Sequence, residues 1–352
     1  MMQDAVVPPS RPARIARRLN WAAGPWARTN WIALSVAVLV MLALPWGINQ
    51  LSIGRFILHL FILFFVWSIV AESWNLIMGV GGIFSFAQIA LFAIGGITTG
   101  ALAKHLGWNP WISLWLAPIA ATIAALIIGL PSLRLRGPYV VLLTLAFSEL
   151  VRNYHSQGPK WVAEGGYGLR YVPKLGLDEM LGNDVGRIAY YYIAFVLFAI
   201  ASYVIWRIFY SPIGVSFRAL RDSETYAISR GVDPYRFKML LFALSAFFTG
   251  LAGGFYVHYN GNQSPAILNF SILVTLLAGI VLGGWGTFWG PIFGTALMIV
   301  LPELLREVDI FRNMAIGIVL ALLAVFAPQG LIPLAIDSIQ KLRKPSPTGE
   351  QT

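Results

Sequence analysis

Long apolar runs, separated by short polar or charged segments, fill most of this 352-residue chain. A helix needs about 20 apolar residues to cross the hydrocarbon core of a bilayer, and ten runs approach that length. These runs cover residues 31–47, 56–78, 86–103, 110–130, 138–154, 188–209, 237–258, 267–282, 287–304 and 313–327. The runs that begin at Phe86, Pro138 and Ile267 are short, and they are also compatible with broken or re-entrant segments. The pattern predicts an all-α polytopic membrane protein of about ten transmembrane helices.

The composition supports this class. Hydrophobic residues make up 58% of the chain and charged residues 11%, whereas soluble domains carry about a quarter charged residues. The chain has no Cys, which excludes disulfides, thiol nucleophiles and Cys-based metal sites. The net charge of +10 comes from basic residues scattered at the ends of apolar runs. The positive-inside rule explains that distribution, so we expect contact with membrane lipid and no binding of nucleic acid.

The basic residues also predict sidedness. If ten spans start from an inside N-terminus, sixteen of the twenty-five Lys and Arg residues fall on the inside, and both termini are cytoplasmic. This topology gives a basic cytoplasmic tail at 1–30, a membrane domain at 31–330 and a cytoplasmic tail at 331–352. It places an outer loop at 157–187 and a cytoplasmic segment at 211–238. That last segment is a charged island between two apolar runs, and we expect it to contact a soluble partner.

Residues 115–134 resemble residues 288–306. Each segment has an aromatic residue, a Pro, a Thr four residues later, a Leu-Pro pair and a closing Arg. The first copy lies on the fourth predicted span and the second on the ninth, which run in opposite directions. The similarity is compatible with two five-helix inverted repeats, 31–156 and 188–330, an arrangement typical of transporters. Chance similarity between two Leu- and Ala-rich helices remains the alternative.

Small residues recur every four positions near the end of the membrane domain. This spacing lets helices approach closely in lipid, and it predicts helix packing at Gly279, Gly283, Gly286, Gly290 and Gly294. The denser clusters Gly79, Gly81, Gly82 and Gly283, Gly284, Gly286 exceed what packing requires. Since non-helical backbone at membrane depth is tolerated where it lines a cavity, we expect these clusters to flank a substrate path.

Polar residues inside apolar runs are costly and therefore informative. Glu72, His258 and Glu303 lie near predicted span ends, and we interpret them as interfacial. The uncharged candidates for a substrate path are Asn75, Ser85, Gln88, Thr144 and Asn269. Amides and hydroxyls at depth suit a neutral or zwitterionic solute better than an ion.

The sequence contains no G-x-x-x-x-G-K-[ST], H-E-x-x-H or G-x-S-x-G motif, and its four His residues lack metal-ligand spacing. We therefore expect no catalytic residues, metal site or cofactor on this chain.

Four blocks identify a family. RLRGPYVVLLTLAFSELVR, EGGYGL, GVSFRALRDSETYAISRGVDPYRFKMLLFALSAFFTGLAGGFY and LAGIVLGGWGTFWGPIFGT, in that order, resemble the LivM-type permease subunits of ABC importers for branched-chain amino acids. The resemblance implies a multi-pass protein of the bacterial inner membrane. It also implies a second, LivH-type permease subunit, two cytosolic subunits that bind ATP, and an extracytoplasmic substrate-binding protein.

The resemblance further implies roles for individual residues. The family's ATPase-coupling loop corresponds to Arg218, Ala219, Leu220, Arg221, Glu224, Ala227 and Gly231. Tyr226 departs from the small residue usual in the family. In the outer loop, Glu164 replaces a Thr and Tyr167 a Pro, which leaves urea or short-chain amides open as substrates. The rival classes are an ion-gradient-driven transporter or channel, which would need a charged residue at mid-membrane, and a membrane scaffold without transport.

Overall fold

The computed structural model describes residues 26–48, 53–135, 137–304 and 317. The chain divides into two units, Met1–Leu58 and His59–Thr352. In the first unit, α2 (Trp26–Ile48) contains the predicted first span, and α3 (Gly54–Asn75) begins. The predicted span 313–327 lies outside the described residues except at Gly317. The tail 331–352 and most of the tail 1–30 also lie outside them.

The second unit contains the rest of α3, which continues as a π-helix, η2 (Leu76–Val80). The following elements are α4 (Gln88–His105), α5 (Pro110–Leu114), α6 (Ala117–Ser132), α7 (Pro138–Gln157), α8 (Lys160–Ala163), η3 (Glu164–Gly166), α9 (Leu177–Leu181), α10 (Asn183–Phe209), α11 (Pro212–Asp222), α12 (Glu224–Ser229), α13 (Pro234–Asn260), η4 (Pro265–Leu268), α14 (Phe270–Gly284) and α15 (Trp289–Leu304). Within the described residues, β structure is limited to one isolated bridge, between Leu169 and Gln263.

Three α-helices start at the same local signal, a polar residue followed by Pro. Asn109, Ser211 and Asp233 each accept a hydrogen bond from a backbone N–H of the first turn, and each precedes a Pro. Pro is favoured at this position because its missing N–H would have had no helical partner. α13 ends at Gly261, whose positive φ of 73° suits a residue without a side chain.

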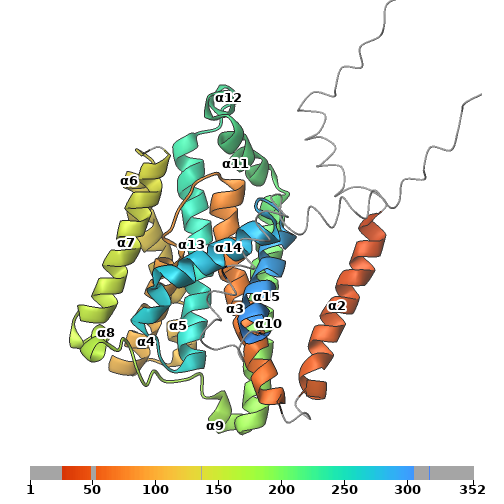
Figure 1. The fold of residues 1–352 in the computed structure, drawn as a ribbon, viewed down its shortest axis with the longest axis vertical. Helices are drawn as coiled ribbons and strands as arrows, with labels where there is room; N and C mark the ends of the chain where they lie inside the picture. Colours follow the sequence, from red (N-terminus) through yellow and green to blue (C-terminus); the bar gives the residue numbers. More distant parts are fainter. Residues whose placement is uncertain (1–25, 49–52, 136, 305–316, 318–352) are drawn as a thin grey trace, which may run out of the picture. The chain divides into compact units, whose positions relative to one another are not determined.

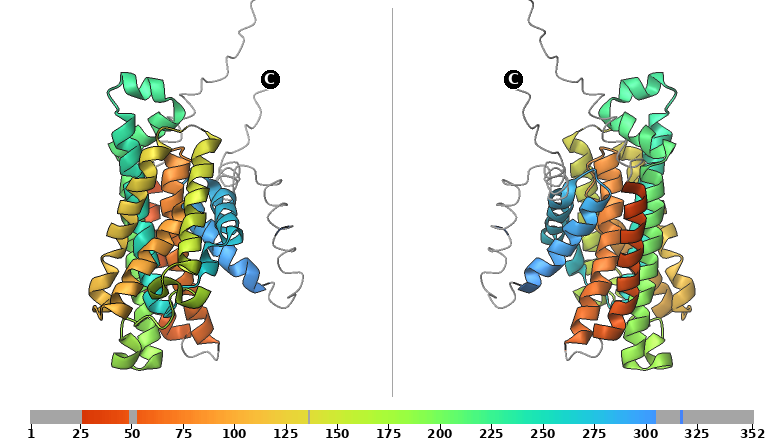
Figure 2. Two further views of the ribbon diagram at one scale, coloured as in Figure 1. Left: turned by 90° about the vertical axis from the view of Figure 1, so that its left-hand side faces the viewer. Right: turned by 90° about the vertical axis from the view of Figure 1, so that its right-hand side faces the viewer.

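The centre of the second unit is α13, which packs against α4 and α6 (Figure 1). Glycines make this close approach possible. A Cβ atom at Gly253 would collide with the Phe92 carbonyl oxygen on α4, and one at Gly250 would collide with Ala121 on α6. Helices α14 and α15 pack against each other on one flank of the bundle (Figure 2). Side chains would clash where Gly279 meets Gly294 and where Gly283 meets Gly290.

Among the described residues, four helical segments are long and apolar enough to cross a membrane. They are Gly54–Val80, Pro110–Ser132, Asp184–Phe209 and Pro234–Asn260. The apolar helices α14 and α15 are shorter than these four. The structure thus confirms the predicted all-helical polytopic class. The number of ten spans and the inverted repeat remain predictions.

Candidate functional site

The segment 211–238 folds into α11, α12 and the first turn of α13, at one end of the second unit (Figure 1). Helices α8 and α9 lie at the opposite end, and we call the two the α11–α12 end and the α8–α9 end. On α11, Phe217 and Leu220 are buried, and Phe217 packs edge-on against Phe237 of α13. Apolar contact therefore fixes one face of α11 to the membrane helices.

Two arginines of α11 reach back to the membrane helices. Arg218 Nη1 donates a hydrogen bond to the Phe209 carbonyl at the end of α10, at 2.9 Å, and its guanidinium lies 5.2 Å from the centre of the Phe209 ring. Burial, and then the charge of Arg221, lower the pKa of Arg218. Arg221 Nη1 donates to the Gly79 carbonyl of η2 at 2.6 Å. Cations are favoured at helix C-terminal ends, where carbonyls lack partners.

Helix α12 turns other side chains outward. Ala227 is buried, whereas Tyr226 is 57% exposed and Ile228 is 53% exposed. The helix ends in a Schellman motif, because the N–H of Gly231 bonds to the Ile228 carbonyl and the N–H of Val232 bonds to the Ala227 carbonyl. Gly231 has the required positive φ, 83°. The structure therefore gives Gly231 a conformational role.

Glu224, at the first turn of α12, forms an ion pair with Lys238 of α13, with 3.0 Å between Oε1 and Nζ. Of the other predicted coupling residues, Ala219 and Leu220 lie on α11 between the two arginines that contact the membrane helices. The segment therefore has a face held by the membrane helices and an exposed face on α12.

Three of the predicted path residues surround the non-helical connection between η2 and α4. The Thr144 hydroxyl accepts from the Phe86 N–H at 2.9 Å, and the Ser85 hydroxyl accepts from the Ala87 N–H at 3.3 Å. Gln88 Nε2 donates to the Ser73 carbonyl at 3.4 Å. All three side chains are buried. In this conformation Thr144 and Ser85 therefore hold the backbone of the break, and Gln88 joins the start of α4 to α3.

Asn75, the last residue of α3, joins the start of η2 to the turn between α14 and α15. Its Oδ1 accepts from the Gly286 N–H at 2.9 Å, and its Nδ2 donates to the Thr287 carbonyl at 2.8 Å. Gly286 lies in that turn with a φ of 72°, so its predicted role in helix packing is wrong. Spacing alone missed the turn because Gly279, Gly283, Gly286, Gly290 and Gly294 read as one continuous pattern. Asn269, the fifth predicted path residue, is exposed at the start of α14.

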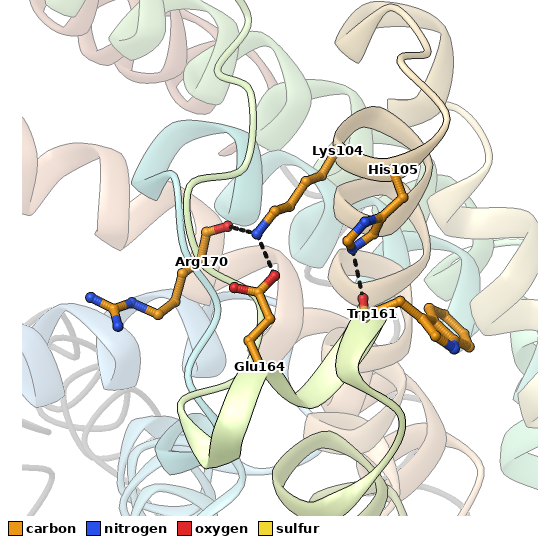
Figure 3. A network of polar contacts seen from close by, with 5 residues as sticks. All are labelled: Lys104, His105, Trp161, Glu164 and Arg170. Carbon is orange, nitrogen blue, oxygen red and sulfur yellow. Dashed lines mark hydrogen bonds and ion pairs between the residues drawn. The ribbon is translucent and has the colours of Figure 1, made fainter.

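At the α8–α9 end, the predicted outer loop, 157–187, is attached to the last turn of α4 (Figure 3). Lys104 forms an ion pair with Glu164 and also donates to the Arg170 carbonyl at 2.7 Å. His105 Nε2 lies 2.9 Å from the Trp161 carbonyl oxygen. These contacts bring the family-like segment that begins at Glu164 against the end of α4.

Beneath this loop lies a buried polar cluster that the sequence analysis missed. Gln263 pairs with Leu169 through two backbone hydrogen bonds, of 3.1 and 2.7 Å, and its Nε2 donates to the Ala93 carbonyl. His155 Nε2 contacts the Gln263 carbonyl at 2.8 Å. The polar character of His155 and Gln263 was the available signal, but nothing in the sequence pairs residues 108 positions apart.

Two residues interpreted as interfacial are instead buried. Glu72 is 1% exposed and accepts a hydrogen bond from Ser202 of α10 at 2.7 Å. His258 lies between the Ser113 hydroxyl and the Pro173 carbonyl. Protein groups, and not water or headgroups, therefore surround these two side chains, and their depth in the membrane stays a prediction. Run length gives an approximate depth but does not say which face of a helix meets protein.

A groove of about 600 Å³ lies between α4 and α7. It is lined by Ile94, Ile97, Thr98, Ala101, Leu102, His105, Leu106, Leu150, Val151, Tyr154 and Trp161. Its lining is largely apolar, and it contains none of the five predicted path residues. Among the described residues, no group of three or more His, Cys, Asp or Glu side chains is placed to hold a metal ion.

Comparison with known proteins agrees with the resemblance seen in the sequence. The family model described as "Branched-chain amino acid transport system / permease component" matches residues 56–327. The high-affinity branched-chain amino acid transport system permease protein LivM of Escherichia coli is 30% identical over 339 residues, which cover 90% of this chain and 79% of that protein. Its Salmonella typhimurium counterpart is 28% identical over the same shares. A probable LivM of Methanocaldococcus jannaschii is 25% identical over 294 residues, 73% of this chain and 81% of that protein. No solved structure matches the chain.

Proposed function

Since this chain belongs to the family of permease components of branched-chain amino acid transport systems, we propose that it forms one half of the translocation pathway of an ATP-driven importer. The chain contributes no catalysis. ATP is bound and hydrolysed by two cytosolic subunits, a second, LivH-type permease completes the pathway, and an extracytoplasmic protein delivers the substrate. The membrane is the bacterial inner membrane, with both termini in the cytoplasm.

The observation that carries the proposal is the exposure of apolar side chains on α12. Tyr226 and Ile228 project from a charged segment, at the end of the bundle where basic residues predict the cytoplasm. Exposed aromatic and aliphatic groups outside lipid are typical of protein interfaces. A soluble ATPase that covers α12 would bury them, while Arg218 and Phe217 keep α11 fixed to the membrane helices.

The proposal includes ten spans in two inverted halves, with the path near the broken segment at 81–87. In this conformation a solute would reach Ser85, Gln88 and Thr144 only after their backbone hydrogen bonds open. Asn75 is bonded to the turn at Gly286, and Asn269 is exposed. Because the chain has no Cys, topology is testable with single-Cys variants labelled from either side of the membrane.

The test is a pull-down of the affinity-tagged chain with its partners, followed by uptake assays in proteoliposomes. Ile228→Asp is expected to reduce recovery of the ATPase subunits at least about tenfold, as loss of an interface anchor does. Tyr167→Asp is the matched control, because Tyr167 is 68% exposed at the opposite end. Equal ATPase recovery from both variants would contradict the docking role of α12.

The uptake panel contains leucine, isoleucine, valine, urea and acetamide. Uptake of the branched-chain amino acids, dependent on ATP, is the expected result. Uptake of urea or acetamide instead would assign the alternative substrate class. Uptake that follows an ion gradient without ATP would contradict the proposed importer.

A further inference from the structure

Arg221 faces the membrane helices, although the family resemblance groups it with residues that contact the ATPase. Its Nη1 donates to the Gly79 carbonyl at 2.6 Å, and its aliphatic stem lies over Gly82. A Cβ atom at Gly82 would lie 3.0 Å from the Arg221 Cβ and closer still to Cγ. The side chain of Arg221 therefore packs on the end of η2 as well as bonding to it.

The carbonyl that Arg221 contacts is available because the helix ends with η2. The N–H of Gly81 bonds to the Leu76 carbonyl, and the N–H of Ile83 bonds to the Ile77 carbonyl. Gly79 lies in the last turn of η2, where carbonyls have no helical partner. The end of η2 thus leaves the Gly79 oxygen to the guanidinium. π-helical turns are frequent at functional sites.

The other side of η2 is fastened to the turn between α14 and α15. Asn75, one residue before η2, makes both hydrogen bonds to that turn, at Gly286 and Thr287. The two backbones are also close, because a Cβ atom at Gly79 would lie 2.6 Å from the Trp285 ring and 2.8 Å from the Gly286 nitrogen. A continuous chain of contacts therefore runs from α11, through η2, to the start of α15.

We propose that Arg221 transmits movement of α11 to η2, and that Asn75 passes it on to the turn at Gly286. This inference rests on the proposed function, because it requires an ATPase that moves α11. The break at 81–87 and the turn at 285–288 then shift together when α11 shifts. Arg221 is a positioning residue in this account and does not touch substrate.

An arginine suits this task. Its guanidinium stays charged at any physiological pH, and its long stem covers Gly82 while the head group reaches the carbonyl. A hydrogen bond from a charged donor is about twice as strong as one between neutral groups. Arg236 offers a matched comparison, since it lies in the first turn of α13 and its Nε pairs with Asp233 Oδ2 at 3.2 Å.

The experiment uses the whole importer in proteoliposomes and measures both ATP hydrolysis and uptake. Arg221→Met keeps the apolar stem and removes the donor. We expect normal recovery of the ATPase subunits and continued ATP hydrolysis. The ratio of substrate moved to ATP hydrolysed should fall about tenfold, because the variant loses one charge-assisted hydrogen bond. Arg221→Lys is expected to restore part of this ratio, and Arg236→Met is expected to leave it unchanged.

A double variant separates transmission from simple anchoring. If Arg221 and Asn75 act in series, Arg221→Met combined with Asn75→Leu reduces the ratio no further than either change alone. If the two contacts are independent, the reductions of the two single variants multiply in the double variant, and the proposal is overturned. If ATPase subunits are lost from the Arg221→Met variant, Arg221 serves to dock the ATPase. If the ratio of substrate moved to ATP hydrolysed is unchanged, Arg221 does not couple the two. Both outcomes reject this inference, whereas the proposed function fails only in the Ile228→Asp and uptake tests.

Discussion

At the α8–α9 end, main-chain pairing joins the loop at 157–187 to the segment that follows α13, in addition to the side-chain contacts of Lys104 and His105. Leu169 and Gln263 exchange two main-chain hydrogen bonds, and the N–H of Val172 bonds to the Gly261 carbonyl at 2.8 Å. At the α11–α12 end, Arg218 and Arg221 instead reach main-chain carbonyls with long side chains. A backbone pairing fixes two segments in one register, whereas a long side chain keeps its contact while helices tilt. We therefore expect the α8–α9 end to keep its register and the α11–α12 end to allow helices to tilt.

The largest effect is expected from Gly168→Val at the α8–α9 end. Gly168 has a φ of 77°, and a Cβ atom there would lie 2.7 Å from Pro265 Cδ and 2.8 Å from His155 Nε2. Strain and overpacking together should destabilise the protein by about 3 kcal/mol or more. Thermal unfolding in detergent measures this. The control is Gly165→Val, at φ 76° with no atom within 4 Å, for which only the strain, about 1–2 kcal/mol, is expected.

A smaller effect is expected at the break near η2. Thr144→Val keeps the shape of the side chain but removes the acceptor for the Phe86 N–H. A buried donor without a partner costs about 1–3 kcal/mol, and thermal unfolding should show a loss in that range. Thr275→Val is the control, because the Thr275 hydroxyl bonds to the Ser271 carbonyl within its own helix. Equal losses from the two variants would contradict a special role for Thr144.

Lys104→Met tests the ion pair that holds the loop at the α8–α9 end. Both partners are largely shielded, with side chains 23% and 20% exposed, so the pair should contribute about 1 kcal/mol, near the top of the range for surface pairs. Hydrogen exchange is expected to rise at residues 164–170 and to stay unchanged at residues 212–229. Faster hydrogen exchange at both ends would mean that the stability of one end depends on contacts at the other.

The smallest effect is expected from Lys238→Gln, which removes the partner of Glu224. The Glu224 side chain is 47% exposed, so the stability change should be about 0.5 kcal/mol and should shrink as salt is added. Thermal unfolding at low and high salt measures it. A change of several times this size would show that the pair determines the position of α12, and that the α11–α12 end is more rigid than the comparison implies.

The sequence predicted the helical class and the family because both depend on local signals. Run length identifies helices, and polar residues before Pro, such as Asp233, mark their starts. The contacts of the candidate site were less accessible. Helices that are apolar on all sides carry little information about which face meets which neighbour. Nothing local turns Arg221 toward Gly79, which lies 142 positions away, or reveals that η2 leaves that carbonyl available. The family pattern groups Arg221 with Glu224 because they are close in the sequence. In the structure, Arg221 contacts Gly79 of η2, whereas Glu224 pairs with Lys238 of α13.

The length of α14 has a consequence for the surrounding lipid. Its 15 residues measure about 22 Å, whereas the 27 residues of α13 measure about 40 Å. The hydrocarbon core of a bilayer is about 30 Å thick, so one helix falls short of it and the other exceeds it. Lipid against the flank formed by α14 has to thin, or protein has to cover that flank, and either adjustment has an elastic cost that depends on acyl-chain length. Where lipid meets α14, the free energy of this conformation therefore depends on bilayer thickness.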